Sequence, residues 1–234
     1  MAEVRLTAGN DIYRQDHADR GRWDQVYGLE GNDQITRYQG SALGGPGNDT
    51  IEGLSGEPWL YFEASYWDSP AGIEVNLAEG WANDGWGGRD TLVNVSNVHA
   101  SNRDDRVTGN DFDNTFVPKN GRNTVDGAGG VDQINFEWIN PGNGPGRTPT
   151  LADLVIDASV DGRRIVITPL ASYPQDFHNT LLNIEWIQLP EHWGPGLAFS
   201  TADLVTPQTM PATASWPATP CAGTPRPPWA APST

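Results

Sequence analysis

Large apolar residues recur every nine residues in the middle of the chain, and a polar residue stands two places before each of them. The apolar residues are Val107, Phe116, Val125 and Ile134, and the polar residues are Asp105, Asn114, Asn123 and Asp132. An amphipathic helix repeats every 3.6 residues or so and a half-buried strand every two, so a nine-residue period fits neither. It predicts a solenoid in which very short strands alternate with tight polar loops.

The same pattern occurs earlier in the chain, in loops that are rich in glycine. Residues 44–52 read GGPGNDTIE and match the repeat G-G-x-G-x-D-x-U-x at every specified position. Residues 28–35 and 85–92 match it with one glycine replaced, and residues 127–134 end the central run. One such repeat buries almost nothing, so we expect adjacent copies to stack through the apolar residue of each x-U-x strand.

The spacing of glycine and aspartate suits a calcium site. Glycine accepts crowded or left-handed backbone angles, so a loop can direct several carbonyl oxygens at one point while aspartate supplies charge. Calcium takes six to eight oxygen ligands in loose geometry, which matches such loops better than zinc or magnesium coordination does. The expected ligands lie in these loops: Asp11, Asp24, Gly28, Glu30, Asn32, Asp33, Gly45, Gly47, Asn48, Asp49, Gly85, Gly87, Asp90, Asp105, Asn114, Asn123 and Asp132.

These repeats resemble the hemolysin-type, repeats-in-toxin (RTX) calcium-binding family of secreted bacterial proteins. The resemblance implies a right-handed parallel β-roll, a β-solenoid in which calcium lies between loops on the same edge of successive turns. It would pair Asp105 with Asn123 on one edge and Asn114 with Asp132 on the other. Because asparagine offers only a neutral oxygen, we expect these central sites to be weak or empty.

The resemblance extends beyond the loops. Residues 71–97 resemble the spacer between roll segments, and residues 180–189 resemble a segment that closes a roll. Only sixteen residues separate the aspartates of the first two glycine-rich repeats, and we interpret this spacing as an enlarged loop through Tyr38, Gly40 and Ala42. The sequence leaves the register of calcium pairing there open.

The chain is expected to be all-β, with a C-terminal β cap and an extended tail. The predicted divisions are an N-terminal β-roll segment at 1–60, spacer strands at 61–100, a second β-roll segment at 101–136, the C-terminal β cap at 137–206 and a Pro-rich tail or linker at 207–234. Within the spacer, residues 61–67 alternate like a half-buried strand. Within the cap, Asp161 and Gly162 predict a hairpin turn between residues 155–160 and 163–170.

Composition narrows the partners. Among 234 residues, 30 acidic groups face 14 basic ones, giving a net charge of −16. This charge disfavours nucleic acid and anionic membrane surfaces, and no segment is long and apolar enough to span a bilayer. The amino terminus has no signal-peptide pattern, which fits the resemblance because that family is commonly exported through an uncleaved C-terminal signal. We expect calcium to relieve repulsion among the aspartates and so to order the chain.

No catalytic motif is present, so a non-enzymatic role is expected. The first interpretation is a structural or adhesive calcium-binding module of an extracellular or surface assembly. The second is a virion or particle decoration or fibre protein that docks through the 207–234 tail, where Trp216 and Trp229 are candidate protein-contacting residues. The third is a carbohydrate-binding or accessory module of a secreted enzyme, with Trp81 and Trp86 as candidates for stacking on polysaccharide.

Overall fold

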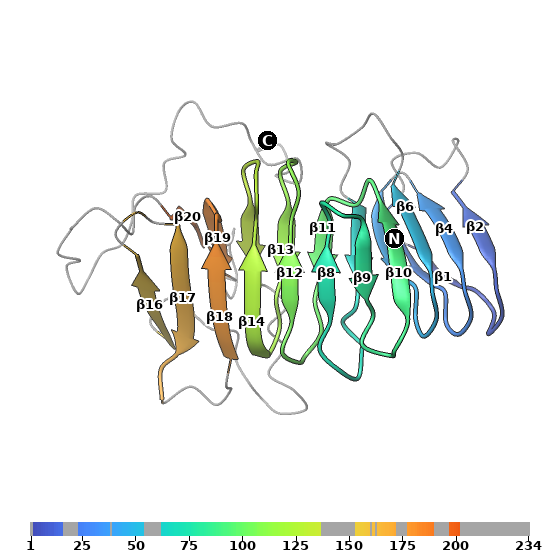
Figure 1. Cartoon of the computed structure of the whole chain (residues 1–234), viewed down its shortest axis with the longest axis horizontal. Helices are drawn as coiled ribbons and strands as arrows, with labels where there is room; N and C mark the ends of the chain where they lie inside the picture. Colours follow the sequence, from blue (N-terminus) through green and yellow to red (C-terminus); the bar gives the residue numbers. More distant parts are fainter. Residues whose placement is uncertain are drawn as a thin grey trace.

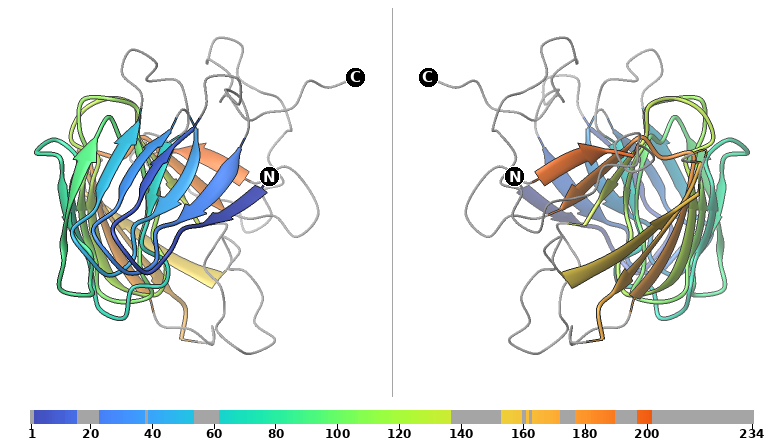
Figure 2. Two further views of the ribbon diagram at one scale, coloured as in Figure 1. Left: turned by 90° about the vertical axis from the view of Figure 1, so that its right-hand side faces the viewer. Right: turned by 90° about the vertical axis from the view of Figure 1, so that its left-hand side faces the viewer.

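The structure, a computed structural model, describes residues 2–15, 23–37, 39–53, 62–136, 153–159, 161, 163–171, 177–189 and 197–201. These residues form strands, turns and loops with almost no helix, so the expectation of an all-β chain is confirmed. The strands belong to two large sheets that lie against each other (Figures 1 and 2). Neither sheet closes on itself, and both contain parallel and antiparallel neighbours.

The nine-stranded sheet contains, in spatial order, β1 (Ala2–Arg5), β3 (Asp24–Tyr27), β5 (Gly40–Leu43), β7 (Phe62–Ser65), β11 (Asn97–His99), β13 (Thr115–Val117), β15 (Gln133–Asn135), β19 (Trp186–Leu189) and β20 (Leu197–Ser200). The eleven-stranded sheet contains β16 (Leu154–Ala158), β17 (Arg164–Pro169), β18 (Phe177–Leu182), β14 (Gly121–Asp126), β12 (Arg106–Thr108), β8 (Glu74–Asn76), β9 (Trp81–Asn83), β10 (Arg89–Val93), β6 (Thr50–Gly53), β4 (Gln34–Arg37) and β2 (Ile12–Arg14).

Most strands pair in parallel with a strand further along the chain. The reason is that the chain crosses to the other sheet and then returns before it adds the next strand to the first sheet. From β1 to β6, and again from β11 to β15, successive strands alternate between the sheets. β9 is the exception inside the eleven-stranded sheet, where it lies antiparallel between β8 and β10. The spacer predicted at 71–97 therefore adds an extra strand to this sheet.

The apolar residues of the repeats form the core between the sheets, as the sequence predicts. Ile35, Ile51 and Leu92 are in register on neighbouring strands, and all three side chains are buried. Two further registers complete this pattern: Val75, Val107, Val125 and Leu181 in one sheet, and Ala42, Ala64, Val98, Phe116, Ile134 and Ile187 in the other. Each large aliphatic side chain buried in this way contributes about 1.5–3 kcal/mol to folding.

The enlarged loop expected between the first two glycine-rich repeats is wrong. Gly40 and Ala42 lie in strand β5, which pairs with β3 and β7, and Ala42 is fully buried. Tyr38 lies outside the described residues. Sixteen residues therefore suffice for a strand in each sheet, because the small residues of β5 fit closely against the core.

Two strand predictions have different outcomes. The hairpin around Asp161 is confirmed, since β16 pairs antiparallel with β17 on either side of it. The half-buried alternation expected from residue 61 to Trp67 is wrong, because all four residues of β7 are buried. Strand β7 is therefore covered on both sides of the nine-stranded sheet. Residue 61, the tail at 207–234 and its candidate docking residues Trp216 and Trp229 lie outside the described residues.

Candidate metal centre

A column of aspartates runs along the edge of the eleven-stranded sheet where its parallel strands begin. Asp33 Oδ1 accepts the Asp11 N–H at 2.8 Å, and Asp49 Oδ1 accepts the Asp33 N–H at 2.8 Å. Asp90 Oδ1 accepts the Asp49 N–H at 2.9 Å. Four of the predicted ligands therefore stack directly on one another, although 41 residues separate the last two in sequence.

The residues just before these aspartates form a second ladder with the opposite donor direction. Asn10 Oδ1 accepts the Asn32 N–H, Asn32 Oδ1 accepts the Asn48 N–H, and Asn48 Oδ1 accepts the Arg89 N–H, each at 2.8 Å. Each loop is thus joined to the next by side chain to backbone bonds in both directions. Asn32 and Asn48, which the sequence offers as ligands, use their side-chain oxygens to hold neighbouring loops together.

The second carboxylate oxygen of several aspartates is buried without a hydrogen-bond partner. Within the described ranges this applies to Oδ2 of Asp33, Asp49, Asp84, Asp105 and Asp132. None of these residues is more than 3% exposed. A buried carboxylate oxygen without a hydrogen-bond donor costs roughly several kcal/mol, so a proton or a cation near each of these atoms would be stabilising.

Glycines create the space into which these oxygens point. A Cβ on Gly44 would overlap the Asp49 carboxylate, five residues later in the same loop. A Cβ on Gly28 would overlap both Asp33 Oδ2 and the carbonyl oxygen of Gly44 in the next loop. The first glycine of the repeat therefore lets a carboxylate and a carbonyl converge. Both groups are hydrogen-bond acceptors. They are stabilised only by a group that both can contact favourably, which is a cation or a hydrogen-bond donor.

Asn123 provides a natural comparison within the same edge. Its Oδ1 accepts the Asp105 N–H at 3.0 Å, as the aspartates above do for their neighbours. Its amide nitrogen stands in place of the second carboxylate oxygen, and it donates to the Lys119 carbonyl at 3.1 Å and to Asn179 Oδ1 at 2.9 Å. At this position an amide nitrogen can donate hydrogen bonds to the surrounding oxygens, whereas a carboxylate oxygen would face only other acceptors.

The opposite edge, where strands of the nine-stranded sheet begin, has a shorter column. Asp132 Oδ1 accepts the Asn114 N–H at 2.8 Å, and Glu185 Oε2 accepts the Asp132 N–H at 2.8 Å. The Asn114 amide nitrogen donates to the Ser96 carbonyl at 2.9 Å. The neighbours implied by the resemblance, Asp105 with Asn123 and Asn114 with Asp132, thus stack as expected, and Glu185 extends the second pair.

The remaining predicted ligands occupy other environments. Asp24 begins β3 in the nine-stranded sheet and is not part of the Asp11 column. The Glu30 side chain is exposed. Asp90 Oδ2 accepts the buried Tyr66 hydroxyl at 3.0 Å, so both of its oxygens have donors. The motif around Asp90 is nearly complete. Its carboxylate nevertheless has a structural role in the column, because neither oxygen is left for a cation.

The backbone positions of the predicted glycine ligands also differ. Gly45 and Gly47 come within overlap distance of the Leu29 and Gly31 carbonyls, so their loop nests tightly on the preceding one. Gly85 approaches the Ala71 carbonyl, whereas a Cβ on Gly87 would meet nothing within 4 Å. The loop at 44–49 is therefore packed closely on the loop before it, whereas the loop at 85–90 is open at Gly87.

Burial shifts the acid–base equilibria of these carboxyls. Loss of hydration raises the pKa of Asp49 to about 7, of Asp90 and Asp132 to about 8, and of Asp105 to about 6. The pKa of Asp33 is raised for the same reason. Neighbouring carboxylates add to the shift, Asp33 and Asp84 acting on Asp49 and Glu185 acting on Asp132. The ionised loops therefore repel one another unless a positive charge is present.

A pH dependence follows for the metal-free chain. Because the folded pKa values lie above the usual value near 3.8, protonation stabilises the folded state, and this contribution is lost as pH rises toward about 8. We expect the chain, dialysed free of metal, to unfold at a lower temperature at pH 8 than at pH 5. Thermal unfolding followed by circular dichroism measures this. An unchanged or higher unfolding temperature at pH 8 would contradict it.

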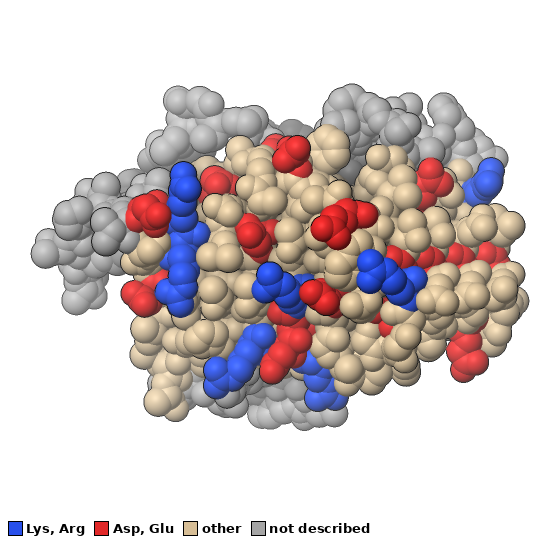
Figure 3. Space-filling view, viewed as in Figure 1, with Lys and Arg blue, Asp and Glu red and all other residues tan. Residues whose placement is uncertain are grey.

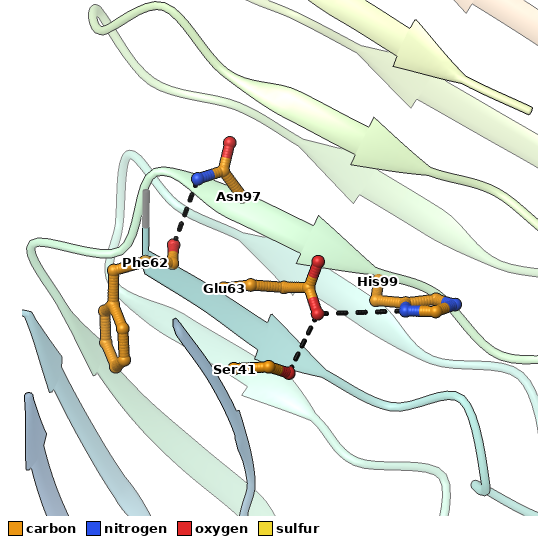
Figure 4. A network of polar contacts seen from close by, with 5 residues as sticks. All are labelled: Ser41, Phe62, Glu63, Asn97 and His99. Atoms are coloured by element: carbon orange, nitrogen blue, oxygen red, sulfur yellow. Dashed lines mark hydrogen bonds and ion pairs between the residues drawn. The ribbon is translucent and has the colours of Figure 1, made fainter. Parts of the chain in front are cut away.

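A separate polar network lies on the nine-stranded sheet (Figure 4). Ser41 Oγ donates to Glu63 Oε1 at 2.8 Å, and His99 Nδ1 lies 3.7 Å from the same oxygen. Asn97 donates to the Phe62 carbonyl at 3.3 Å beside them. A serine nucleophile would need to give its proton to the imidazole, whereas this hydroxyl donates to the carboxylate. The network therefore holds three strands together and does not form a nucleophile and base.

The arrangement suits binding by mixed oxygen ligands. Nowhere in the described part of the chain do three Asp, Glu, His or Cys side chains gather into one metal cluster. A cation at these loops would be held by one or two carboxylates together with backbone carbonyls and water, a ligand set that calcium accepts. The sequence missed Asp84 and Glu185, because neither falls in phase with the nonapeptide repeats.

The surfaces and comparisons add further findings. On the described part of the face formed by the eleven-stranded sheet, Lys and Arg are interspersed with Asp and Glu, apart from one narrow run of Lys and Arg at the left (Figure 3). The described residues include no helix with the length and apolar character needed to cross a membrane.

The chain matches no protein-family model, and no curated protein matches it.

Proposed function

We propose that this protein is a calcium-stabilised parallel β-roll of the RTX type, acting as a non-enzymatic structural or adhesive module of an extracellular or surface assembly. The observation that carries the proposal is the set of buried, unpartnered Oδ2 atoms of Asp33, Asp49, Asp105 and Asp132, which lie in loops stacked along two edges. Alternation of short parallel strands between two sheets supports the roll.

Calcium has a definite role in this proposal. It neutralises the carboxylates that face carbonyl groups, and it thereby joins each loop to the next in addition to the backbone ladders. Because the loops lie at both edges of the sheets, binding and folding are coupled. The module is then rigid where calcium is abundant and loosened where it is scarce.

Asp49→Asn and Asp33→Asn test the role of these carboxylates. Asparagine keeps the Oδ1 acceptor of the ladder and replaces the unpartnered oxygen by an amide, as Asn123 does naturally. We expect each variant to bind at least one calcium ion fewer than the wild type in calorimetric titration, and to gain less thermal stability from calcium. Asp157→Asn, which changes an exposed aspartate of strand β16 outside the stacked loops, is the control. If the wild type binds no calcium at millimolar concentration, the proposal fails.

A polysaccharide-binding role has less structural support. One face of the Trp81 ring is covered by the Arg89 guanidinium, 4.1 Å from the ring centroid, and its indole N–H donates to Glu79 at 2.7 Å. Trp86 is 46% exposed, but a single exposed indole offers only a small platform for a sugar ring. The structural role therefore remains the function that the geometry favours.

A further inference from the structure

The loop that follows the antiparallel strand β9 fills a gap in the first column of loops. Since β9 runs opposite to its neighbours, its end lies at the edge where β6 and β8 begin. Gly88 closely approaches the Gly47 carbonyl in the loop before β6, and Gly85 approaches the Ala71 carbonyl in the loop before β8. The loop at 84–88 is therefore placed between two loops that are not consecutive in sequence.

Asp84 organises this loop through one of its oxygens. Oδ1 accepts the N–H groups of Trp86, Gly87 and Gly88 at 2.8, 2.9 and 2.8 Å. Three N–H donors on one oxygen fix the direction of the Asp84 carboxylate. The turn at 84–88 thus depends on Oδ1 alone and makes no use of the second oxygen.

The second oxygen of Asp84 points to where the next loop presents acceptors. Asp84 is 1% exposed, and its Oδ2 has no hydrogen-bond partner. Oδ2 lies 2.7 Å from the position that a Cβ on Gly88 would take, and the Gly47 carbonyl oxygen is closer still to that position. Asp49, in the same loop as Gly47, also has a buried and unpartnered Oδ2. A carboxylate oxygen and a carbonyl oxygen therefore meet at this junction, and Asp49 belongs to the loop that supplies the carbonyl.

We propose that Asp84 is a ligand of a calcium site between the loop at 84–88 and the loop at 44–49, together with the Gly47 carbonyl and Asp49. This site would fasten the antiparallel insertion to the parallel strands before it. The chemical identity of the ion rests on the proposed function, whereas the assignment of Asp84 rests on its own buried oxygen.

Asp84→Asn tests this assignment with little disturbance of the turn. The asparagine Oδ1 can still accept the three N–H groups, and its amide nitrogen offers a donor to the Gly47 carbonyl. We expect the variant to bind one calcium ion fewer per chain in calorimetric titration. We also expect opposite signs in thermal unfolding: the variant should be at least as stable as the wild type without calcium and less stable with calcium.

The outcomes separate the two proposals. If Asp84→Asn binds as many calcium ions as the wild type with the same affinity, the Asp84 site is overturned while the proposed function stands. If the wild type binds none, both fail. Asp157→Asn, which removes an exposed charge from strand β16, should leave the number of bound ions unchanged.

A second measurement does not depend on the folding of that variant. Tb³⁺, a hard cation that occupies calcium sites, emits strongly when an excited indole lies close to it. Trp86 is two residues from Asp84 and donates its backbone N–H to it. Trp86→Phe should reduce the indole-sensitised emission while the number of bound Tb³⁺ ions stays the same. Unchanged sensitised emission would place no ion near this loop and would overturn the assignment.

Discussion

Withdrawal of calcium from the wild-type chain is expected to lower its unfolding temperature by roughly 10 °C or more. A site filled at about a hundred times its Kd contributes about 2.7 kcal/mol, and in a chain of this size each kcal/mol shifts the unfolding temperature by about 2–4 °C. Asp33, Asp49 and Asp132 lie in separate loops, so several sites contribute together. Circular dichroism melts with saturating calcium and after chelation measure the shift.

The control for this prediction is ionic strength. A chain with a net charge of −16 gains some stability from any salt, because screening weakens the repulsion between exposed carboxylates. Buried loop aspartates are screened far less, and magnesium keeps much of its hydration shell and requires stricter geometry. Sodium chloride at the same ionic strength, and magnesium at the same concentration, should therefore restore only a small part of the stability. Equal recovery in magnesium would contradict a calcium site in these loops.

Gly45→Ala is expected to destabilise the calcium-loaded protein by roughly 2–5 kcal/mol. Gly45 has a φ of 94°, where an alanine costs about 1–2 kcal/mol. The new Cβ would also overlap the backbone carbonyl of Leu29 in the preceding loop, and relief of such overpacking costs about 1–3 kcal/mol more. Chemical denaturation in saturating calcium measures the change in unfolding free energy.

Gly87→Ala is the matched control for that substitution. Gly87 has a φ of 106°, but a Cβ there would meet no atom within 4 Å. It therefore carries only the conformational cost, about 1–2 kcal/mol. The difference between the two variants isolates the close stacking of the loops at 28–33 and 44–49. Equal destabilisation by both would mean that these loops do not nest as tightly as the structure indicates.

The sequence predicted the parts of the fold that depend on local repetition. A nine-residue period places Val107, Phe116, Val125 and Ile134 in equivalent positions, so their burial follows from the period alone. The stacking of Asp105 with Asn123 follows similarly, because the two are one double repeat of eighteen residues apart. The nine-residue spacing alone is enough to predict these features, because they involve only neighbouring repeats.

Parts that depend on tertiary contacts were not predictable in the same way. Strand β5 has only small residues before Leu43, and its strand character comes from packing between β3 and β7 and not from intrinsic propensity. Asp49 and Asp90 are neighbours only because β9 is inserted antiparallel and brings β10 next to β6. The nine-residue spacing of the repeats does not indicate that a strand is inserted here. Both the insertion and Asp84 were therefore missed at the level of the sequence.

The candidate site shows the same division. The repeat indicated which aspartates lie in glycine loops, but not which oxygens are left without a donor. Asp90 has a nearly complete motif, yet the distant Tyr66 hydroxyl satisfies its second oxygen. Asp84 has no motif position, yet its second oxygen is buried without a partner. Whether a loop carboxylate is available to a cation depends on contacts between loops, which spacing alone does not specify.

The most direct measurement is a calcium anomalous difference map from crystals grown in saturating calcium. The central claim is that a cation lies beside the buried second oxygens of the loop aspartates. Peaks should appear about 2.3–2.6 Å from Oδ2 of Asp33, Asp49 and Asp132, between neighbouring loops. Ordered loops without anomalous peaks at these oxygens would contradict the account.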